Sequence, residues 1–236
     1  AVLRPWRRKL FGLSRAVMKK PPKETALEDR AIEGAKLYSP STARNRDVIR
    51  DVLLKTMPQE GRILEIGAGT GEHAVHIAGA LPEATWFTGD PDETARASIA
   101  AWVAGAGLDN LQGPHAIDVT AQDWEAALDD APYDGIVSIN MIHIAPFEAA
   151  TGLFAGAGRL LRPGGKLFLY GPFARNGAHT APSNEAFNES LKARDPRWGV
   201  RDLEGDILPL AQKNSLSLEE IVEMPANNLS VIFRKN

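Results

Sequence analysis

The 236-residue sequence contains no cysteine, which excludes a disulfide scaffold, a cysteine nucleophile and any cysteine-ligated zinc or iron–sulfur site. It also lacks a long hydrophobic run. The longest stretch without Asp, Glu, Lys or Arg extends from Gly135 to Phe147, and Ser138, Asn140 and His143 interrupt it. A helix that crosses a bilayer needs about 20 mainly apolar residues. We therefore expect a soluble chain without a membrane span.

Acidic residues are missing from the first 23 positions, where eight Lys and Arg residues stand. Because the whole chain has 27 basic and 30 acidic residues, the part after residue 23 holds 19 basic against 30 acidic residues, a balance of −11. Non-specific binding to nucleic acid depends on neutralising phosphates with Lys and Arg. The acidic part of the chain after residue 23 is a poor candidate for that function, so we expect no nucleic-acid partner.

The basic leader permits three interpretations. It could be an organellar presequence, a basic arm that binds an anionic surface, or an extension upstream of a start at Met18. We expect residues 1–36 to form a flexible extension, and the protein to be cytoplasmic unless the leader directs import into an organelle. The sequence leaves the oligomeric state open.

Short apolar runs alternate with segments of helical periodicity along the rest of the chain. We expect helices at 47–57, 71–81, 93–104, 122–128 and 148–161, and strands at 62–66, 85–88, near 117, and at 135–139, 166–170, 216–222 and 229–233. The short apolar runs do not alternate strictly with polar residues. This pattern predicts an α/β fold, with a parallel sheet covered by helices on both faces.

The amino-acid composition changes between residues 171 and 214, where Gly, Pro, Asn and His are frequent and aromatic residues stand among charged ones. A connection of this length inside a compact sheet is usually functional. We expect an insert that covers the substrate; the alternative is a helical cover for the sheet edge.

A glycine loop is the strongest motif: Leu64-Glu65-Ile66-Gly67-Ala68-Gly69-Thr70-Gly71, between the first expected strand and a helix. Glycines there let the backbone approach a ligand closely, and the helix N-terminus offers free N–H groups. The loop alone is ambiguous, because residues 69–74 also satisfy the G-x-G-x-x-G/A dinucleotide fingerprint.

Three carboxylates around the loop favour a different ligand. Glu65 stands two residues before the first glycine, where it suits a cationic ammonium better than a pyrophosphate. Asp90 ends the second strand and can accept hydrogen bonds from both ribose hydroxyls, as in NAD enzymes too. Asp118 follows the third strand and can accept from an adenine amino group. A nucleoside that carries an amino acid and no phosphate fits all three, and that ligand is S-adenosylmethionine.

The sequence from residue 37 onward resembles the class I S-adenosylmethionine-dependent methyltransferases. The turn at 160–167 (LLRPGGKL) is similar to the one before that fold's fifth strand. More narrowly, the chain resembles the methyltransferase-like 26 family, also described as domain of unknown function 938. The runs that carry this resemblance are Ser39-Pro40 with Arg44-Asn45, INMIHI at 139–144, YGPF at 170–173, RDP at 194–196 with Trp198-Gly199, RDLE at 201–204 and MPANN at 224–228.

The resemblance implies a Rossmann-like seven-stranded sheet whose last strand is antiparallel. It places catalytic groups just past the fourth strand, at Asn140 and His143. His143 would act as a general base, since imidazole titrates near neutral pH; the alternative is that it hydrogen-bonds the backbone and packs. Arg44 and Asn45 would precede the helix at 47–57 and fold over the cofactor. The expected cofactor residues are Arg44, Asn45, Glu65, Gly67, Ala68, Gly69, Asp90, Pro91, Asp118, Val119 and Asn140. The expected substrate residues are Tyr38, Met141, Tyr170, Phe173, Asn184, Arg201 and Asp202.

We expect no metal site. His73 and His76 are three residues apart on one expected helix, but no carboxylate stands near them in ligand spacing.

The sequence thus predicts one methyltransferase domain over residues 37–236, which transfers a methyl group from S-adenosylmethionine to oxygen or nitrogen of a small-molecule acceptor. Two alternatives remain. One is a non-catalytic regulatory protein that binds S-adenosylmethionine, and the other is an NAD-dependent oxidoreductase. The acceptor itself is not identified by the sequence.

Overall fold

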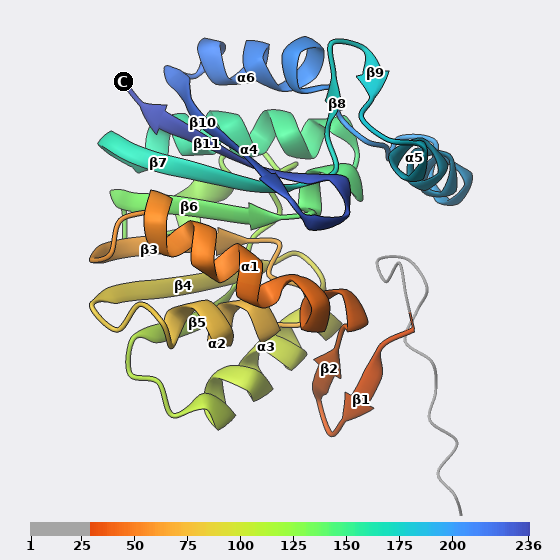
Figure 1. The fold of residues 1–236 in the computed structure, drawn as a ribbon. Helices are drawn as coiled ribbons and strands as arrows, with labels where there is room; N and C mark the ends of the chain where they lie inside the picture. The colour runs from red at the N-terminus through yellow and green to blue at the C-terminus, as the bar shows by residue number, and fades with distance from the viewer. Residues whose placement is uncertain (1–28) are drawn as a thin grey trace, which may run out of the picture.

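The computed structural model describes residues 29–236 (Figure 1). The basic leader at 1–23 lies outside the described residues, as do the expectations for it. The elements, in chain order, are β1 (Ala31–Glu33), β2 (Lys36–Tyr38), α1 (Pro40–Thr56), β3 (Gly61–Ile66), α2 (Glu72–Ala78), β4 (Ala84–Asp90), α3 (Glu93–Ala106), β5 (Leu111–Ala116), η1 (Trp124–Ala127), β6 (Tyr133–Ile139), η2 (Met141–His143), α4 (Phe147–Leu160), β7 (Leu161–Gly171), β8 (Ala174–Arg175), β9 (Ala178–His179), α5 (Pro182–Arg194), η3 (Leu203–Ile207), α6 (Leu208–Lys213), β10 (Leu216–Met224), η4 (Pro225–Asn227) and β11 (Asn228–Lys235).

Seven strands form the central sheet in the order β10-β11-β7-β6-β3-β4-β5. The pairs from β7 through β6, β3 and β4 to β5 are parallel, whereas β11 runs antiparallel to both β7 and β10. This is the sheet expected from the sequence, with the last strand antiparallel. The α/β prediction is confirmed.

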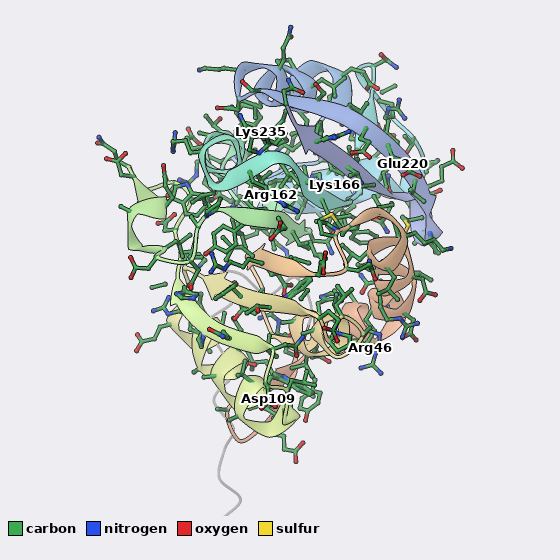
Figure 2. The ribbon with its side chains drawn as sticks, turned by 90° about the vertical axis from the view of Figure 1, so that its left-hand side faces the viewer. Arg46, Asp109, Arg162, Lys166, Glu220 and Lys235 are labelled. Carbon is green, nitrogen blue, oxygen red and sulfur yellow. The ribbon has the colours of Figure 1, made fainter. Side chains whose placement is uncertain are left out.

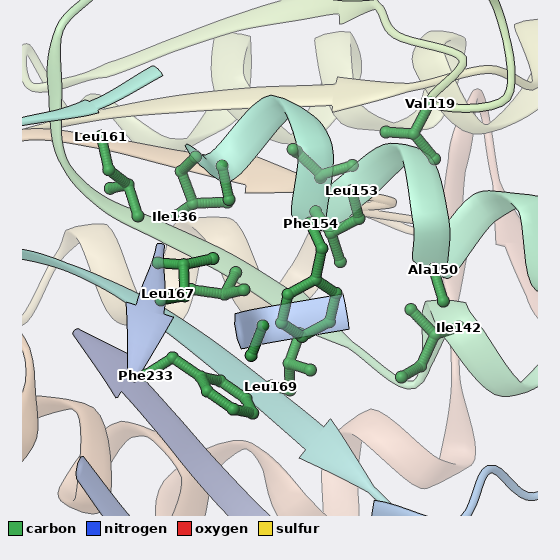
Figure 3. Close-up of a cluster of buried hydrophobic side chains, with 14 of the residues drawn as sticks. Val119, Ile136, Ile142, Ala150, Leu153, Phe154, Leu161, Leu167, Leu169 and Phe233 are labelled. Atoms are coloured by element: carbon green, nitrogen blue, oxygen red, sulfur yellow. The ribbon is translucent and has the colours of Figure 1, made fainter. Parts of the chain in front are cut away.

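Two hydrophobic clusters cover the two faces of the sheet. Adjacent strand residues point to opposite faces; thus Leu64 belongs to one cluster and Ile63 to the other. The first cluster packs α4 and α6 onto the sheet, with Phe154 edge-on to Phe233 at 5.3 Å between ring centroids (Figure 3). The second packs α1 and α2 onto the opposite face. The prediction of helices on both faces is confirmed.

The first helix is longer than the sequence indicated. α1 begins at Pro40 and not at Asp47, so Arg44 and Asn45 lie inside the helix, and the prediction that they precede it is wrong. Ser39 is its N-cap, with a hydroxyl that accepts from the Thr42 amide, and proline stands at the first helical position. These are ordinary start signals. They were missed because apolar periodicity begins only at Val48.

The boundary between extension and domain also needs correction. Residues 31–33, assigned to the flexible extension, pair with 36–38 in an antiparallel hairpin. This hairpin is held on α3, because the Leu37 amide donates to Ser98 Oγ (2.8 Å) and Trp102 Nε1 donates to the Leu37 carbonyl (3.1 Å). The ordered part therefore begins before residue 37.

The parallel strands direct their carboxyl ends to the same edge of the sheet, which is the right-hand side of Figure 1. The β1–β2 hairpin and α5 both lie beyond that edge. At the other end, Lys166 (labelled in Figure 2) donates to the Thr56 carbonyl at 2.7 Å and pairs with Glu219 on β10 at 3.0 Å. This contact joins the end of α1 to the antiparallel edge. Within the described part of the chain, no helix is long and apolar enough to cross a membrane.

Candidate active site

A cavity of about 680 Å³ opens at the carboxyl edge of the sheet. In α/β sheets this edge is where ligands bind. The glycine loop forms its floor, the first turns of α1 form one wall, and α5 with the turn at 225–228 forms the opposite wall. The lining residues are Arg30, Ser39, Ser41, Thr42, Arg44, Glu65, Gly67, Ala68, Gly69, Thr70, His73, Ile139, Asn140, Ile144, Pro172, Ser183, Asn184, Phe187, Ala226, Asn227 and Asn228.

The glycine loop is fastened to the end of β4. The amides of Gly67 and Ala68 both donate to the Gly89 carbonyl, at 2.9 and 3.2 Å. Gly67 and Gly69 have φ of +73° and +58°, a left-handed conformation that side chains disfavour. Nothing lies within 4 Å of the position that a Cβ on Gly69 would take. The loop therefore presents bare backbone to the cavity.

Glu65 brings a buried carboxylate to the cavity. It is 1% exposed, and Trp86 Nε1 donates to its Oε2 at 3.0 Å. Burial raises the pKa of Glu65 to about 7, because removal from water penalises the charged form. A cation at this wall would stabilise the carboxylate. Glu65 thus fits the ammonium group that the sequence interpretation assigned to it.

Asp90 ends β4 beside the glycine loop, next to the residues that line the cavity. Its Oδ2 accepts from the Gly69 amide and its Oδ1 from the Asp92 amide, both at 2.9 Å. Burial raises the pKa of Asp90 above its ordinary value. The carboxylate therefore braces the glycine loop, and its remaining lone pairs are the ones that a ribose would use.

The other expected cofactor residues lie farther away. Pro91 and Asp118 are exposed, and Asp118 Oδ1 accepts from the amide and hydroxyl of Thr120 at 2.9 and 2.6 Å. Val119 is buried in the first hydrophobic cluster. None of the three lines the cavity.

The start of α1 is anchored to the glycine loop by Glu72. Its Oε2 accepts from the Ser39 amide at 2.7 Å and from the Thr70 hydroxyl at 3.0 Å. This anchor turns Ser41, Thr42 and Arg44 toward the cavity. Arg44 therefore lines the cavity from within the helix.

Asn45 faces away from the cavity. Its Oδ1 accepts from His73 Nε2 at 2.9 Å, and its side chain hydrogen-bonds the Tyr170 hydroxyl. Burial, with the nearby charges of His76 and Arg46, lowers the pKa of His73 to about 3. His73 is thus neutral, and Asn45 supports the wall behind it.

His76 lies on the outer side of the same helix, 2.8 Å from Asp47 Oδ1 and 3.1 Å from Arg50 Nη1. Within residues 29–236, no group of three or more His, Asp or Glu side chains is placed to hold a metal ion.

The opposite wall joins two segments that are about 40 positions apart in the chain. Asn184 Nδ2 donates to the Asn227 carbonyl at 2.9 Å, and Asn227 Nδ2 donates to Ser183 Oγ at 3.1 Å. Ala226 and Asn227 both have φ of +58°. Asn140, on the third side of the cavity, has φ of +61°. Non-glycine residues in this region often mark functional sites, and here three of them border one cavity.

His143 is buried one layer behind this cavity. It is 0% exposed, its ring packs edge-on against Phe173 at 4.9 Å, and its Nδ1 accepts from the Arg201 amide at 3.3 Å. Burial and the Arg201 charge lower the pKa of His143 to about 3. This geometry disfavours a general base, which must reach the proton of the acceptor. Asn140, by contrast, lines the cavity.

Of the seven expected substrate residues, only Asn184 lines the cavity. Tyr170 and Phe173 are 3% and 0% exposed, so neither can form a lid. Met141 packs against the first cluster, and the Tyr38 hydroxyl donates to Glu33 at 2.8 Å.

Arg201 and Asp202 hold the insert together. The Arg201 guanidinium donates to the carbonyls of Ile142 and Ala145 at 3.0 and 2.7 Å. Asp202 accepts from the Gly205 and Gly177 amides, both at 2.6 Å.

The insert at 171–214 combines the two roles considered for it. α5 contributes Ser183, Asn184 and Phe187 to the cavity, whereas α6 packs on α4 and β10 as a cover for the sheet. Sequence reasoning missed Ser183, Phe187, Pro172 and the hydroxyl residues of α1. The YGPF run was the available signal for Pro172, whereas no motif pointed to Ser183 or Phe187; only the folded topology brings these residues to the cavity.

The sheet order, the glycine loop after β3 and the carboxylate ending β4 define the class I methyltransferase fold. Solved structures agree. An O-methyltransferase family protein from Burkholderia thailandensis has a TM-score of 0.69 at 12% identity, covering 83% of this chain and 56% of that chain. An O-methyltransferase family 2 protein from Planctomyces limnophilus, in complex with apigenin, has a TM-score of 0.66 at 19% identity, covering 83% and 60%.

The chain belongs to the family described as Protein of unknown function (DUF938), whose family model matches residues 36–235. Among curated proteins it is 30% identical over 169 residues to the release factor glutamine methyltransferase of Gloeobacter violaceus, covering 61% of this chain and 55% of that one. It is 29% identical over 131 residues to the tuberculostearic acid methyltransferase UfaA1 of Mycobacterium tuberculosis, covering 55% and 28%. The chain thus spans about half or less of these relatives' lengths.

Proposed function

We propose that the protein is a methyltransferase that binds S-adenosylmethionine on the glycine loop and methylates oxygen or nitrogen of a small-molecule acceptor. The observation that carries this proposal is a cavity that joins the loop to α5 and the turn at 225–228. Its volume falls within the range of roughly 300–1,000 Å³ typical of ligand sites. One cavity therefore offers room for a cofactor beside an acceptor.

Glu65 favours this cofactor over a dinucleotide. The buried carboxylate would oppose the charge of a pyrophosphate, but it would pair with the ammonium of S-adenosylmethionine. Gly67, Ala68 and Gly69 would hold the nucleoside side of the cofactor by their backbone, with Asp90 on the ribose. When bound, S-adenosylmethionine supplies an electrophilic methyl group. The chain's own contribution is to align an acceptor with it and to exclude water.

The protonation and burial of the histidines limit the chemical class of methyl acceptor that the site can use. His73 borders the cavity but is neutral and donates to Asn45, while His143 is buried. Among the described residues that line the cavity, His73 is the only histidine, and its lowered pKa makes it a weak base at neutral pH. An acceptor whose own oxygen is ionised near neutral pH, such as a carboxylate or an acidic phenol, needs no such base. We propose that the acceptor belongs to this class.

The test incubates the full-length protein and methyl-labelled S-adenosylmethionine with a fractionated metabolite extract. We expect label in an organic product and formation of S-adenosylhomocysteine, and neither with the Gly69→Val variant. Label recovered only in macromolecules would overturn the small-molecule acceptor. Tight cofactor binding without turnover in any fraction would favour the regulatory alternative.

A further inference from the structure

One ring nitrogen of the buried His143 side chain makes no hydrogen bond with any described residue. Nδ1 accepts from the Arg201 amide, so the proton of the neutral ring resides on Nε2. Among the described residues, His143 Nε2 has no hydrogen-bond partner, although it is fully buried. A buried donor without a partner is costly and calls for a functional explanation.

Asn140, which lines the cavity, places a side-chain hydrogen-bond acceptor near this donor. A Cβ on Gly171 would lie 2.5 Å from His143 Nε2 and 3.4 Å from Asn140 Oδ1. Both atoms therefore face the same side of Gly171, one as a donor and the other as an acceptor. Gly171 leaves the room that this pair needs.

The backbone around His143 is fixed from two directions. The Gly199 amide donates to the His143 carbonyl at 3.0 Å, and the Arg201 guanidinium bonds the carbonyls of Ile142 and Ala145. The backbone of Asn140 is held by its N–H group, which donates to the Tyr170 carbonyl at 2.8 Å. What these contacts leave adjustable is the Asn140 side chain.

We propose that His143 is a positioning residue: rotation of the Asn140 side chain, which the backbone contacts leave free, brings Oδ1 to the unpartnered His143 Nε2–H and thereby turns the Asn140 amide nitrogen into the cavity toward the ligands. The insert at 171–214 contributes α5 to the cavity wall. Through Arg201, the same insert also fixes the position of the His143 ring. The proposal rests on the proposed function for the identity of the ligand. Asn140 would contact the ligand, and His143 would act only through Asn140.

The first test requires neither a methyl-accepting substrate nor a variant of the protein. Nitrogen-15 NMR of the full-length protein reports which ring nitrogen of His143 carries the proton. We expect Nε2 to be protonated, without titration between about pH 6 and pH 8. A proton on Nδ1, or titration in that range, would overturn the proposal and restore the general base.

The second test compares His143→Gln, which keeps an N–H near the Nε2 position, with His143→Leu, which removes it. We expect His143→Leu to shift the Asn140 side-chain amide resonances and to weaken S-adenosylhomocysteine binding about tenfold, the value of one hydrogen bond. His143→Gln should leave the resonances in place and the affinity within about threefold.

A double-mutant cycle with Asn140→Ala completes the design. If His143 acts through Asn140, the double variant binds no more weakly than Asn140→Ala alone. Additive losses, or unchanged Asn140 resonances in His143→Leu, contradict the proposal. If S-adenosylhomocysteine does not bind the wild type, the proposed function fails, while the resonances of the ligand-free protein still decide the role of His143.

Discussion

Gly69 offers the cleanest single-residue test of the glycine loop. A Cβ there would have no described protein atom within 4 Å, and Gly69 lines the cavity, so we expect a valine side chain to occupy space that the ligand needs. We expect Gly69→Val to lose S-adenosylhomocysteine binding by at least about 100-fold in calorimetry. Gly67→Val should abolish binding too, but its Cβ would also lie 2.7 Å from Met141 Cγ, so it disturbs the protein itself.

Gly34 provides the matched control for this substitution. Its φ of +61° equals that of Gly69 within a few degrees, and it also has open space around it, but it lies in the hairpin turn and outside the cavity. Gly34→Val therefore carries the same backbone strain without filling the site. If both valine variants lose binding equally, the loss reports strain rather than occupation of the cavity.

Glu65 predicts a pH dependence of cofactor binding. Its pKa is raised to about 7, so the carboxylate is present above pH 7 and is lost as the pH falls below it. Because the ammonium of the ligand prefers the carboxylate form, affinity should be about tenfold weaker at pH 6 than at pH 8. Calorimetry at the two pH values measures this ratio, and Glu65→Gln should abolish it. A ratio that persists in Glu65→Gln would assign the effect to another group.

At the scale of elements, the ends of β4 and β5 make a paired comparison. Asp90→Ala removes a buried carboxylate that braces the Gly69 amide and that would bind the ribose. Charge-assisted hydrogen bonds contribute roughly 1.5–3 kcal/mol each, so we expect a loss of cofactor affinity of at least about 100-fold. Asp118 is exposed, and Asp118→Ala should cost less than about tenfold. Asp90→Ala binding within about threefold of wild type would show that Asp90 does not hold the ribose.

The elements that sequence reasoning located are those whose burial leaves a periodic pattern. The strands β3, β4, β6 and β7 and the helix α4 carry apolar residues at the expected spacing, because these elements pack on the clusters. The first half of α1 is polar, since it borders the cavity, and apolar periodicity cannot locate it. Each strand of the β1–β2 hairpin is only three residues long, which is too short to show a periodic pattern.

The site also has one part that the sequence predicts and one part that only the fold brings together. The glycine loop is contiguous in sequence, so its residues could be named before the fold was known. The opposite wall arises because the chain returns to the same edge through α5 and again at 225–228, a proximity that no local pattern encodes. Tyr170 and Phe173 belong to the YGPF run of the family resemblance, which implies a substrate role for both, but the surrounding elements bury them.

At the scale of the whole molecule, both hydrophobic clusters and the seven-stranded sheet lie within residues 37–235. We therefore expect a chain that begins at Glu24 to melt within about 5 °C of the full chain and to bind S-adenosylhomocysteine equally well. Thermal unfolding and calorimetry of the two chains test this. A larger drop in melting temperature, or lost binding, would show that residues 1–23 belong to the fold or the site.

The most direct measurement of the central claim is a calorimetric titration of the full-length protein with S-adenosylhomocysteine and, separately, with NAD. The buried carboxylate at Glu65 and the bare backbone of the glycine loop predict binding of S-adenosylhomocysteine at one site per chain, and no detectable binding of NAD. Binding of NAD in preference to S-adenosylhomocysteine would contradict the assignment of the cavity. Heat from neither ligand would contradict it as well.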